Sequence, residues 1–158
     1  MKIEYRLGDM FKAPERCLIH GCNSQGVMGS GVAKAVRELY PDAYSAYVVK
    51  HRTDGLRLGE VVWVECGERI IGNAITQDRY GRDLNTVYCS YDAIQTAMVE
   101  VQRYAAEHGL DRVGMPLIGS GLGNGDWTYI ARIIEDAAVT FTPVVYIVER
   151  DIYLKMIS

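Results

Sequence analysis

Two glycine-rich turns carry the residues of this chain that are best suited to bind an anion. The first reads Gly26-Val-Met-Gly29-Ser-Gly31 and the second reads Gly119-Ser-Gly121-Leu-Gly123-Asn-Gly125. Each turn follows a short apolar run and precedes a helical pattern. Backbone N–H groups and the positive end of a helix dipole are therefore expected to face the space between the strand and the helix. Phosphate is the natural occupant of such a turn. Two turns far apart in sequence therefore predict a cleft closed from both sides around a diphosphate.

Neither turn matches a standard nucleotide-binding fingerprint. The first has the spacing G-x-x-G-x-G instead of G-x-G-x-x-G, and no G-x-x-x-x-G-K-[ST] motif occurs in the chain. These absences argue against a dinucleotide-dependent dehydrogenase and against a P-loop ATPase. The alternative is that the glycines only form tight turns, but the presence of two such turns before helices favours phosphate binding.

Apolar periodicity predicts the elements that must position these turns. Six short apolar runs predict strands at residues 3–7, 17–22, 61–64, 69–75, 112–115 and 144–148. Three patterns of i, i+3, i+4 recurrence predict helices, at residues 32–39 before Pro41, at residues 94–105 before Gly109, and at residues 130–138. Ser90 and Asp126 are placed to cap the second and third of these helices.

Strands that alternate with helices predict an α/β fold. We expect one domain over residues 1–158, a three-layer α/β/α sandwich whose central sheet is mixed, largely parallel and made of about six strands. Ligands bind such sheets at the carboxyl ends of the strands. Both glycine turns follow strands, so a single cleft can hold them together. The polar stretch 76–86 is the candidate for a mobile loop over this cleft.

Composition narrows the function classes. The net charge of −3 and the pI near 5.6 predict no general nucleic-acid binding, and no basic patch interleaves the eleven tyrosines. The four cysteines show no C-x-x-C pair and no histidine at zinc-ligand spacing, so we expect no metal and no cofactor. An N-terminal apolar segment and a run of 18 apolar residues are both absent, which predicts a soluble, cytoplasmic protein without membrane partners.

The residue order around the turns resembles the macrodomain family, whose members bind ADP-ribose. Gly8-Asp9 ends the first predicted strand, His20-Gly21-Cys22-Asn23 leads into the first turn, and Met115-Pro116-Leu117-Ile118-Gly119 leads into the second. The resemblance runs over almost the whole chain. The segment 20–23, together with Gly29-Ser30-Gly31-Val32-Ala33, is most similar to the branch of ADP-ribose 1″-phosphate phosphatases and ADP-ribosyl-acid hydrolases.

The resemblance implies binding roles for named residues. Asp9 would accept a hydrogen bond from the adenine amino group beside the backbone of Met10, and Asn23 would bond the hydroxyls of the distal ribose. A strand-end turn is the alternative role for Asp9, and an Asx turn is the alternative for Asn23. The two turns would wrap the diphosphate with Gly29, Ser30, Gly31 and Val32 on one side and Ser120, Gly121, Leu122 and Gly123 on the other.

His20 and Asp126 are candidates for catalytic residues. Asn23 would assist them by orienting the hydroxyls of the distal ribose. His20 could donate a proton to a leaving oxygen or attack phosphorus, because an imidazole titrates near neutral pH. Its alternative is a structural histidine at a strand end. Asp126 could orient a water molecule, or it could serve only as a helix cap.

The chain also departs from the related branch that removes ADP-ribose from glutamate through a lysine. That lysine follows an Ile-Thr step like Ile75-Thr76, and Gln77 and Asp78 stand in its place here. The acidic residue of that branch falls on Gly123.

We therefore expect a hydrolase that converts ADP-ribose 1″-phosphate to ADP-ribose and phosphate, a metal-independent phosphomonoesterase. The alternatives are a hydrolase of ADP-ribosyl-protein or O-acetyl-ADP-ribose, a non-catalytic module that binds ADP-ribose or an ADP-ribosylated macromolecule, and binding of another nucleotide diphosphate.

Overall fold

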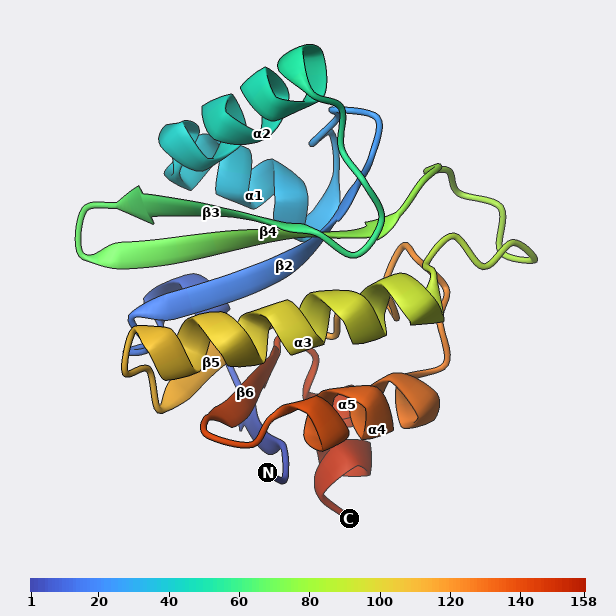
Figure 1. The fold of residues 1–158 in the computed structure, drawn as a ribbon. Helices are drawn as coiled ribbons and strands as arrows, with labels where there is room; N and C mark the ends of the chain where they lie inside the picture. Colours follow the sequence, from blue (N-terminus) through green and yellow to red (C-terminus); the bar gives the residue numbers. More distant parts are fainter.

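A six-stranded sheet with helices on both faces forms the centre of the molecule (Figure 1). The computed structural model describes residues 1–158. The strands are β1 (Glu4–Leu7), β2 (Cys17–Asn23), β3 (Val61–Cys66), β4 (Arg69–Gln77), β5 (Arg112–Met115) and β6 (Thr142–Ile147). The helices are α1 (Gly31–Leu39), α2 (Pro41–Thr53), α3 (Tyr91–Glu107), α4 (Trp127–Ala137) and α5 (Arg150–Ile157), with a short 3-10 turn at Met10–Lys12. The predicted α/β fold with six strands is confirmed.

The strand order is β1-β6-β5-β2-β4-β3. All neighbours pair in parallel except β3, which forms an antiparallel hairpin with β4. The carboxyl ends of β1, β6, β5, β2 and β4 consequently lie along one edge of the sheet, and the two glycine turns follow β2 and β5 at this edge.

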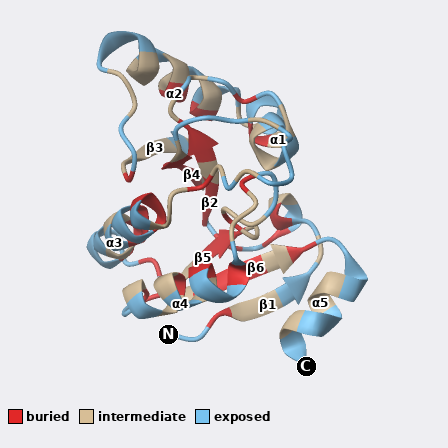
Figure 2. Cartoon of the chain, turned by 90° about the vertical axis from the view of Figure 1, so that its right-hand side faces the viewer, coloured by how far each residue is buried: buried red, intermediate tan, exposed pale blue.

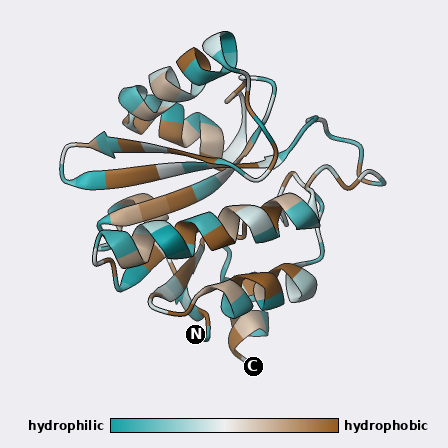
Figure 3. Cartoon of the chain, viewed as in Figure 1, coloured by the Kyte–Doolittle hydropathy of each residue, from teal (hydrophilic) through white to brown (hydrophobic).

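The central strands are buried on both faces, as Figure 2 shows in red. On one face, Ile19, Val113 and Val145 belong to the large cluster beneath α3 and α4. On the other face, Leu18 and Ile71 pack with residues of α1 and α2. A strand that is buried on both faces has a continuous run of apolar residues in place of alternating apolar and polar ones. Short apolar runs therefore predict these strands. Figure 3 shows the same apolar strands between helices with polar outer surfaces.

Two helices escaped prediction because their sequences carry little helical periodicity. In α2 only Ala43 and Tyr47 are buried, and in α5 no residue is buried. Pro41 ends α1 as predicted, but it also occupies the first turn of α2, where the missing N–H costs nothing. The predicted caps are confirmed, since the side chains of Ser90 and Asp126 accept hydrogen bonds from the backbone N–H groups of Ala93 and Thr128.

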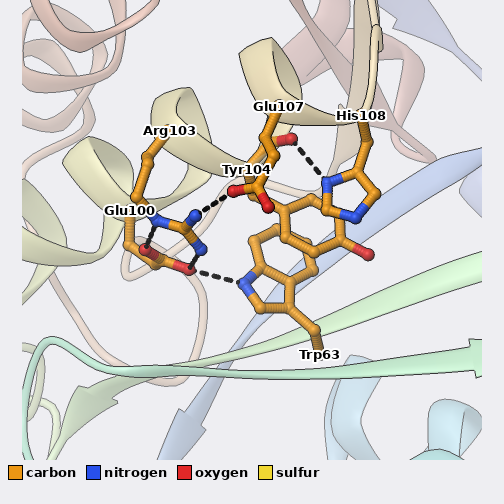
Figure 4. A network of polar contacts seen from close by, with 6 residues as sticks. All are labelled: Trp63, Glu100, Arg103, Tyr104, Glu107 and His108. Carbon is orange, nitrogen blue, oxygen red and sulfur yellow. Dashed lines mark hydrogen bonds and ion pairs between the residues drawn. The ribbon is translucent and has the colours of Figure 1, made fainter.

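A stacked aromatic group attaches α3 to the outer strand of the sheet (Figure 4). The rings of Trp63 and Tyr104 are parallel with centroids 3.8 Å apart, and His108 stacks on the other side of Tyr104 at 3.9 Å. The indole N–H of Trp63 donates to Glu100, which also pairs with Arg103.

None of the helices combines the length and apolar character that a membrane crossing needs.

Replacement of Trp63 by phenylalanine tests this attachment. Trp63→Phe keeps an aromatic ring but removes the N–H that donates to Glu100 at 2.8 Å. We expect the free energy of unfolding to fall by about 1 kcal/mol, because one hydrogen bond is lost. Urea denaturation measures the change, with Val99→Ala on the exposed side of α3 as the control. Equal stability of Trp63→Phe and the wild type would contradict the assignment.

Candidate active site

A cavity of about 460 Å³ opens at the carboxyl ends of β2, β4 and β5. Three loops surround it: the first glycine turn, the second glycine turn, and the loop after β4. Its lining comprises Gly21, Cys22, Asn23, Val27, Gly29, Ser30, Gly31, Val32, Ala33, Thr76, Gln77, Tyr80, Gly81, Arg82, Pro116, Leu117, Ile118, Gly119, Gly121, Leu122 and Gly123. The single cleft expected between the two turns is therefore present.

The two turns meet at one point of the cavity wall. A Cβ placed on Gly31 would lie 3.4 Å from Cδ1 of Leu122, which belongs to the other turn. Gly31 has a φ of 62° and Gly119 has a φ of 77°, both in the region that favours glycine. The bond from the N–H of Gly125 to the carbonyl of Gly119 closes the second turn at 2.7 Å. The glycines thus form tight turns and also allow the close approach between them.

Both turns present backbone N–H groups without an acceptor on the main chain. In the first turn these belong to Gly29, Ser30 and Gly31 and continue into the first residues of α1, where a helix always leaves its N–H groups unpaired. In the second turn they belong to Gly121, Leu122 and Gly123, among which only the carbonyl groups take part in backbone hydrogen bonds. Such groups, together with the α1 dipole, favour an anion between the turns.

Arg82 is the one charged side chain in the cavity lining. No carboxylate, imidazole or lysine lines the cavity, and the pKa of the Cys22 thiol is raised by burial, so this group stays protonated. The electrostatic character of the site therefore comes from backbone N–H groups and one guanidinium. The phenol of Tyr80 is the remaining lining side chain of a type that serves as a general acid or base.

Asn23 lies at the base of the first turn and uses its amide to shape it. The side-chain oxygen accepts from the N–H of Gln25 at 3.0 Å and of Val27 at 3.4 Å, and the side-chain nitrogen donates to the carbonyl of Val27 at 2.8 Å. The hydroxyl of Tyr47, from α2, lies 2.6 Å from the Asn23 carbonyl and 2.9 Å from its side-chain oxygen. The Asx-turn role is thus observed, and Asn23 also lines the cavity.

His20 is not among the residues that line the cavity, and its surroundings match the structural alternative expected for it. Alternation along β2 directs its ring to the face covered by α1 and α2, where 1% of the residue is exposed. Its Nε2 lies 2.6 Å from the side-chain oxygen of Asn73, whose nitrogen donates to the carbonyl of Ala43 in α2. His20 therefore donates through Nε2 and joins β2, β4 and α2 as a structural residue.

Four other predicted site residues lie outside the cavity lining. Asp126 is exposed and caps α4, which is the alternative role expected for it. Ser120 belongs to the second turn without lining the cavity. Asp9 and Met10 lie at the carboxyl end of β1, where the side chain of Asp9 caps the 3-10 turn by accepting from the N–H of Phe11.

The loop after β4 is attached to both glycine turns. Near its start, the Asp78 carboxylate accepts from the hydroxyl of Ser24 and from the amide of Gln25, both of which follow Asn23. Near its end, the side chain of Asn124 donates to the carbonyls of Asp83 at 3.0 Å and Thr86 at 2.8 Å. The predicted loop over the cleft is thus present and is held at two points.

Asn124 and Tyr47 are site-shaping residues that sequence reasoning missed. Asn124 has a φ of 57°, the one positive φ outside glycine, and asparagine tolerates this conformation better than most residues. An asparagine between two glycines was the available signal. Tyr47 offered no signal, because the contact between α2 and the first turn depends on tertiary packing.

The family comparison agrees with the fold and the site. The Macro domain family model matches residues 19–134, which include both glycine turns, and the chain therefore belongs to the macro domain family. The resemblance expected from the motifs is confirmed.

Two curated relatives carry names of hydrolases. The DNA ADP-ribosyl glycohydrolase of Mycobacterium tuberculosis is 26% identical over 139 residues, which cover 85% of this chain and 38% of the relative. The chain thus spans well under half of that protein. The ADP-ribose 1″-phosphate phosphatase of Meyerozyma guilliermondii is also 26% identical, over 163 residues that cover 85% of this chain and 93% of the relative.

Solved structures share the fold over almost the whole chain. A protein of Bacteroides thetaiotaomicron superposes with a TM-score of 0.82 at 27% identity, covering 92% of this chain and 99% of its own. A macrodomain protein of Streptomyces coelicolor gives a TM-score of 0.76 at 29% identity, covering 94% and 100%.

The buried position of His20 predicts a pH-dependent stability. Burial lowers its pKa to about 4, against the opposing effect of the Asn73 hydrogen bond. Between pH 6.5 and pH 4 the unfolded chain therefore binds a proton at His20 that the folded protein does not, so stability falls as the pH falls. We expect unfolding free energy to drop by about 3 kcal/mol more in the wild type than in His20→Gln between pH 7 and pH 4.

Urea denaturation at several pH values measures this difference. Glutamine can still donate to Asn73 but does not titrate in this range, so the shared titration of carboxylates cancels between the two proteins. Parallel stability profiles would show that the His20 ring is not held neutral inside the protein.

Proposed function

We propose that the cavity binds ADP-ribose with the diphosphate between the two glycine turns, and that the protein hydrolyses ADP-ribose 1″-phosphate to ADP-ribose and phosphate. One observation carries the proposal. Two turns about ninety residues apart line a single cavity, their residues have N–H groups without a backbone acceptor, and the one charged residue in the lining is Arg82. A diphosphate matches this arrangement because it offers several acceptor oxygens and negative charge at one place.

The strand order supports one orientation of this ligand. Along the carboxyl edge the sequence of strands is β1, β6, β5, β2 and β4. The adenine would lie toward Asp9 at the end of β1, where the carboxylate has one oxygen not used by the cap. The diphosphate would lie between the turns after β5 and β2, and the distal ribose beside Asn23 and the loop after β4.

Hydrolysis in this site would depend on position and electrostatics. The oxygen of a water molecule would form a bond to phosphorus while the bond from phosphorus to the C1″ oxygen breaks, and the proton lost by water would go to the leaving oxygen. Phosphoryl transfer passes through a loose transition state, so aligned N–H groups and one cation can supply much of the rate. Neither His20 nor Asp126 takes part in this scheme, since both lie outside the cavity lining.

Two observations favour the phosphate ester over other leaving groups. Gln77 lines the cavity where the glutamate-specific branch would have a lysine, so covalent removal of ADP-ribose through a lysine has no nucleophile here. In addition, the alignment with the fungal ADP-ribose 1″-phosphate phosphatase covers 93% of that protein. ADP-ribosyl-protein and O-acetyl-ADP-ribose remain the alternative substrates for the same cavity.

A second candidate function is a binding module without catalysis. It is favoured by the absence of any carboxylate, imidazole or lysine in the lining. Such a module would bind free ADP-ribose or an ADP-ribosylated macromolecule through the same two turns, and it would release no phosphate.

Gly121→Val tests the proposed site. A Cβ at Gly121 would meet no atom within 4 Å, and its φ is not in the positive region, so the variant should fold normally and add a branched side chain to the lining of the cavity. We expect the wild type to bind ADP-ribose more tightly than AMP and to release phosphate from the 1″-ester. The variant should bind ADP-ribose at least tenfold more weakly because the N–H groups are blocked.

Calorimetric titration measures affinity, and a phosphate-release assay measures turnover. The control is Gly121→Ala, which adds a single methyl group and should cause a smaller loss. Binding without phosphate release would support the module, whereas equal affinity of the wild type and Gly121→Val would contradict the placement of the ligand.

A further inference from the structure

We propose that Arg82 binds the group carried by the distal ribose, so that the site selects ligands with an anionic substituent there over unsubstituted ADP-ribose. This inference rests on the proposed function and names the residue that would distinguish its substrate from its product. It depends on three features of the structure: the position of Arg82 along the sheet edge, its lack of an intramolecular partner, and the attachment of its loop.

The first feature is the order of the loops along the carboxyl edge. Arg82 belongs to the loop that starts at the end of β4, beyond the turns after β5 and β2 when the edge is followed from β1, and that reaches back to Asn124 of the second turn at Asp83. Four strand spacings separate β1 from β4, which is roughly 19 Å. A ligand with its base near β1 and its diphosphate between the turns therefore brings its far end to β4. In the sheet Asn23 is paired with Gln77, so the ribose end and this loop are neighbours.

The second feature is that Arg82 has no charged partner within the protein. Arg79 on the same loop shares this property, but Arg82 lines the cavity and Arg79 does not. The guanidinium of Arg82 forms no ion pair, although two carboxylates lie on the same loop. Asp78 accepts from Ser24 and Gln25, and Asp83 accepts from the N–H of Asn85 and the hydroxyl of Thr86. The donors around Asp83 also lower its pKa. Since these carboxylates are satisfied elsewhere, the guanidinium keeps all of its donors for a ligand.

The third feature is that the loop is attached on both sides of Arg82. Asp78 is bonded to the segment after Asn23, and the carbonyl of Asp83, the next residue after Arg82, accepts from Asn124 in the second turn. Arg82 thus lies in sequence between a contact to the segment before the first glycine turn and a contact to the second glycine turn. Less conformational freedom is lost when an attached cation binds than when a free loop must be ordered.

The chemistry of a guanidinium then defines the preferred substituent. A phosphomonoester offers two or more charged oxygens that match the planar fork of arginine, and such charge-assisted pairs are strong. An acetyl ester offers one neutral carbonyl oxygen, and the plain hydroxyl of ADP-ribose offers no charge. The diphosphate itself already has the N–H groups of both turns.

A pair of arginine variants tests the inference. Arg82→Gln removes the charge that lines the cavity, whereas Arg79→Gln removes an exposed charge on the same loop that does not line it. We expect Arg82→Gln to lower kcat/KM for ADP-ribose 1″-phosphate at least tenfold, which is roughly the loss of one charge-assisted hydrogen bond. Its Kd for ADP-ribose should stay within threefold of the wild type. The kcat/KM of Arg82→Lys should lie between those of the wild type and Arg82→Gln. The kcat/KM of Arg79→Gln should match that of the wild type.

The outcomes separate this inference from the proposed function. If Arg82→Gln weakens both ligands equally, the cation binds the diphosphate and the inference is wrong, and if it changes neither ligand, the inference is also wrong. If the wild type binds ADP-ribose but releases no phosphate, the proposed hydrolysis is wrong. The inference about Arg82 can then still be tested, because the intact 1″-phosphate ester allows its Kd to be compared directly between the same variants. If the wild type binds neither ligand, the proposed function and the inference both fail.

Discussion

The main physical constraint on this protein is that two separate glycine turns, both with backbone N–H groups that have no acceptor on the main chain, line one cavity. Unpaired main-chain donors are costly when they are shielded from water, so most proteins satisfy them within their own fold. Here glycine allows both turns to stay tight, and the start of α1 leaves further donors free for geometric reasons. Because the turns follow β2 and β5, which are neighbours in the sheet, the donors of both reach the same space.

The buried polar residues around the site serve mainly to hold this arrangement. Tyr47 and Asn23 hold the base of the first turn, and Asn124 connects the second turn to the loop after β4. His20 is buried and joins β2, which leads into the first turn, to β4, which leads into the loop that contains Arg82. The imidazole of His20 thus stabilises the fold, while Arg82 is the one charged residue in the cavity lining.

Local patterns predicted the strands, the caps and the two turns because each depends on neighbours in sequence. The strand order places the turns together, and the rule that ligands bind at carboxyl ends was enough to anticipate the cleft. The burial of His20 could not be predicted from the sequence, because the face of β2 that its ring occupies is covered by α2, a helix with weak helical periodicity. The catalytic role of His20 stays a prediction. The roles of Asn124 and Tyr47 depend on contacts between segments 38 and 24 residues apart, which a sequence pattern does not encode.

Amide NMR during a titration with ADP-ribose tests the central claim most directly. If both turns bind one diphosphate, the backbone N–H resonances of residues 29–33 and 121–123 shift together, saturate at one ligand per protein and give a single Kd. Shifts confined to one of the two turns, or separate affinities for the two sets, would contradict the account.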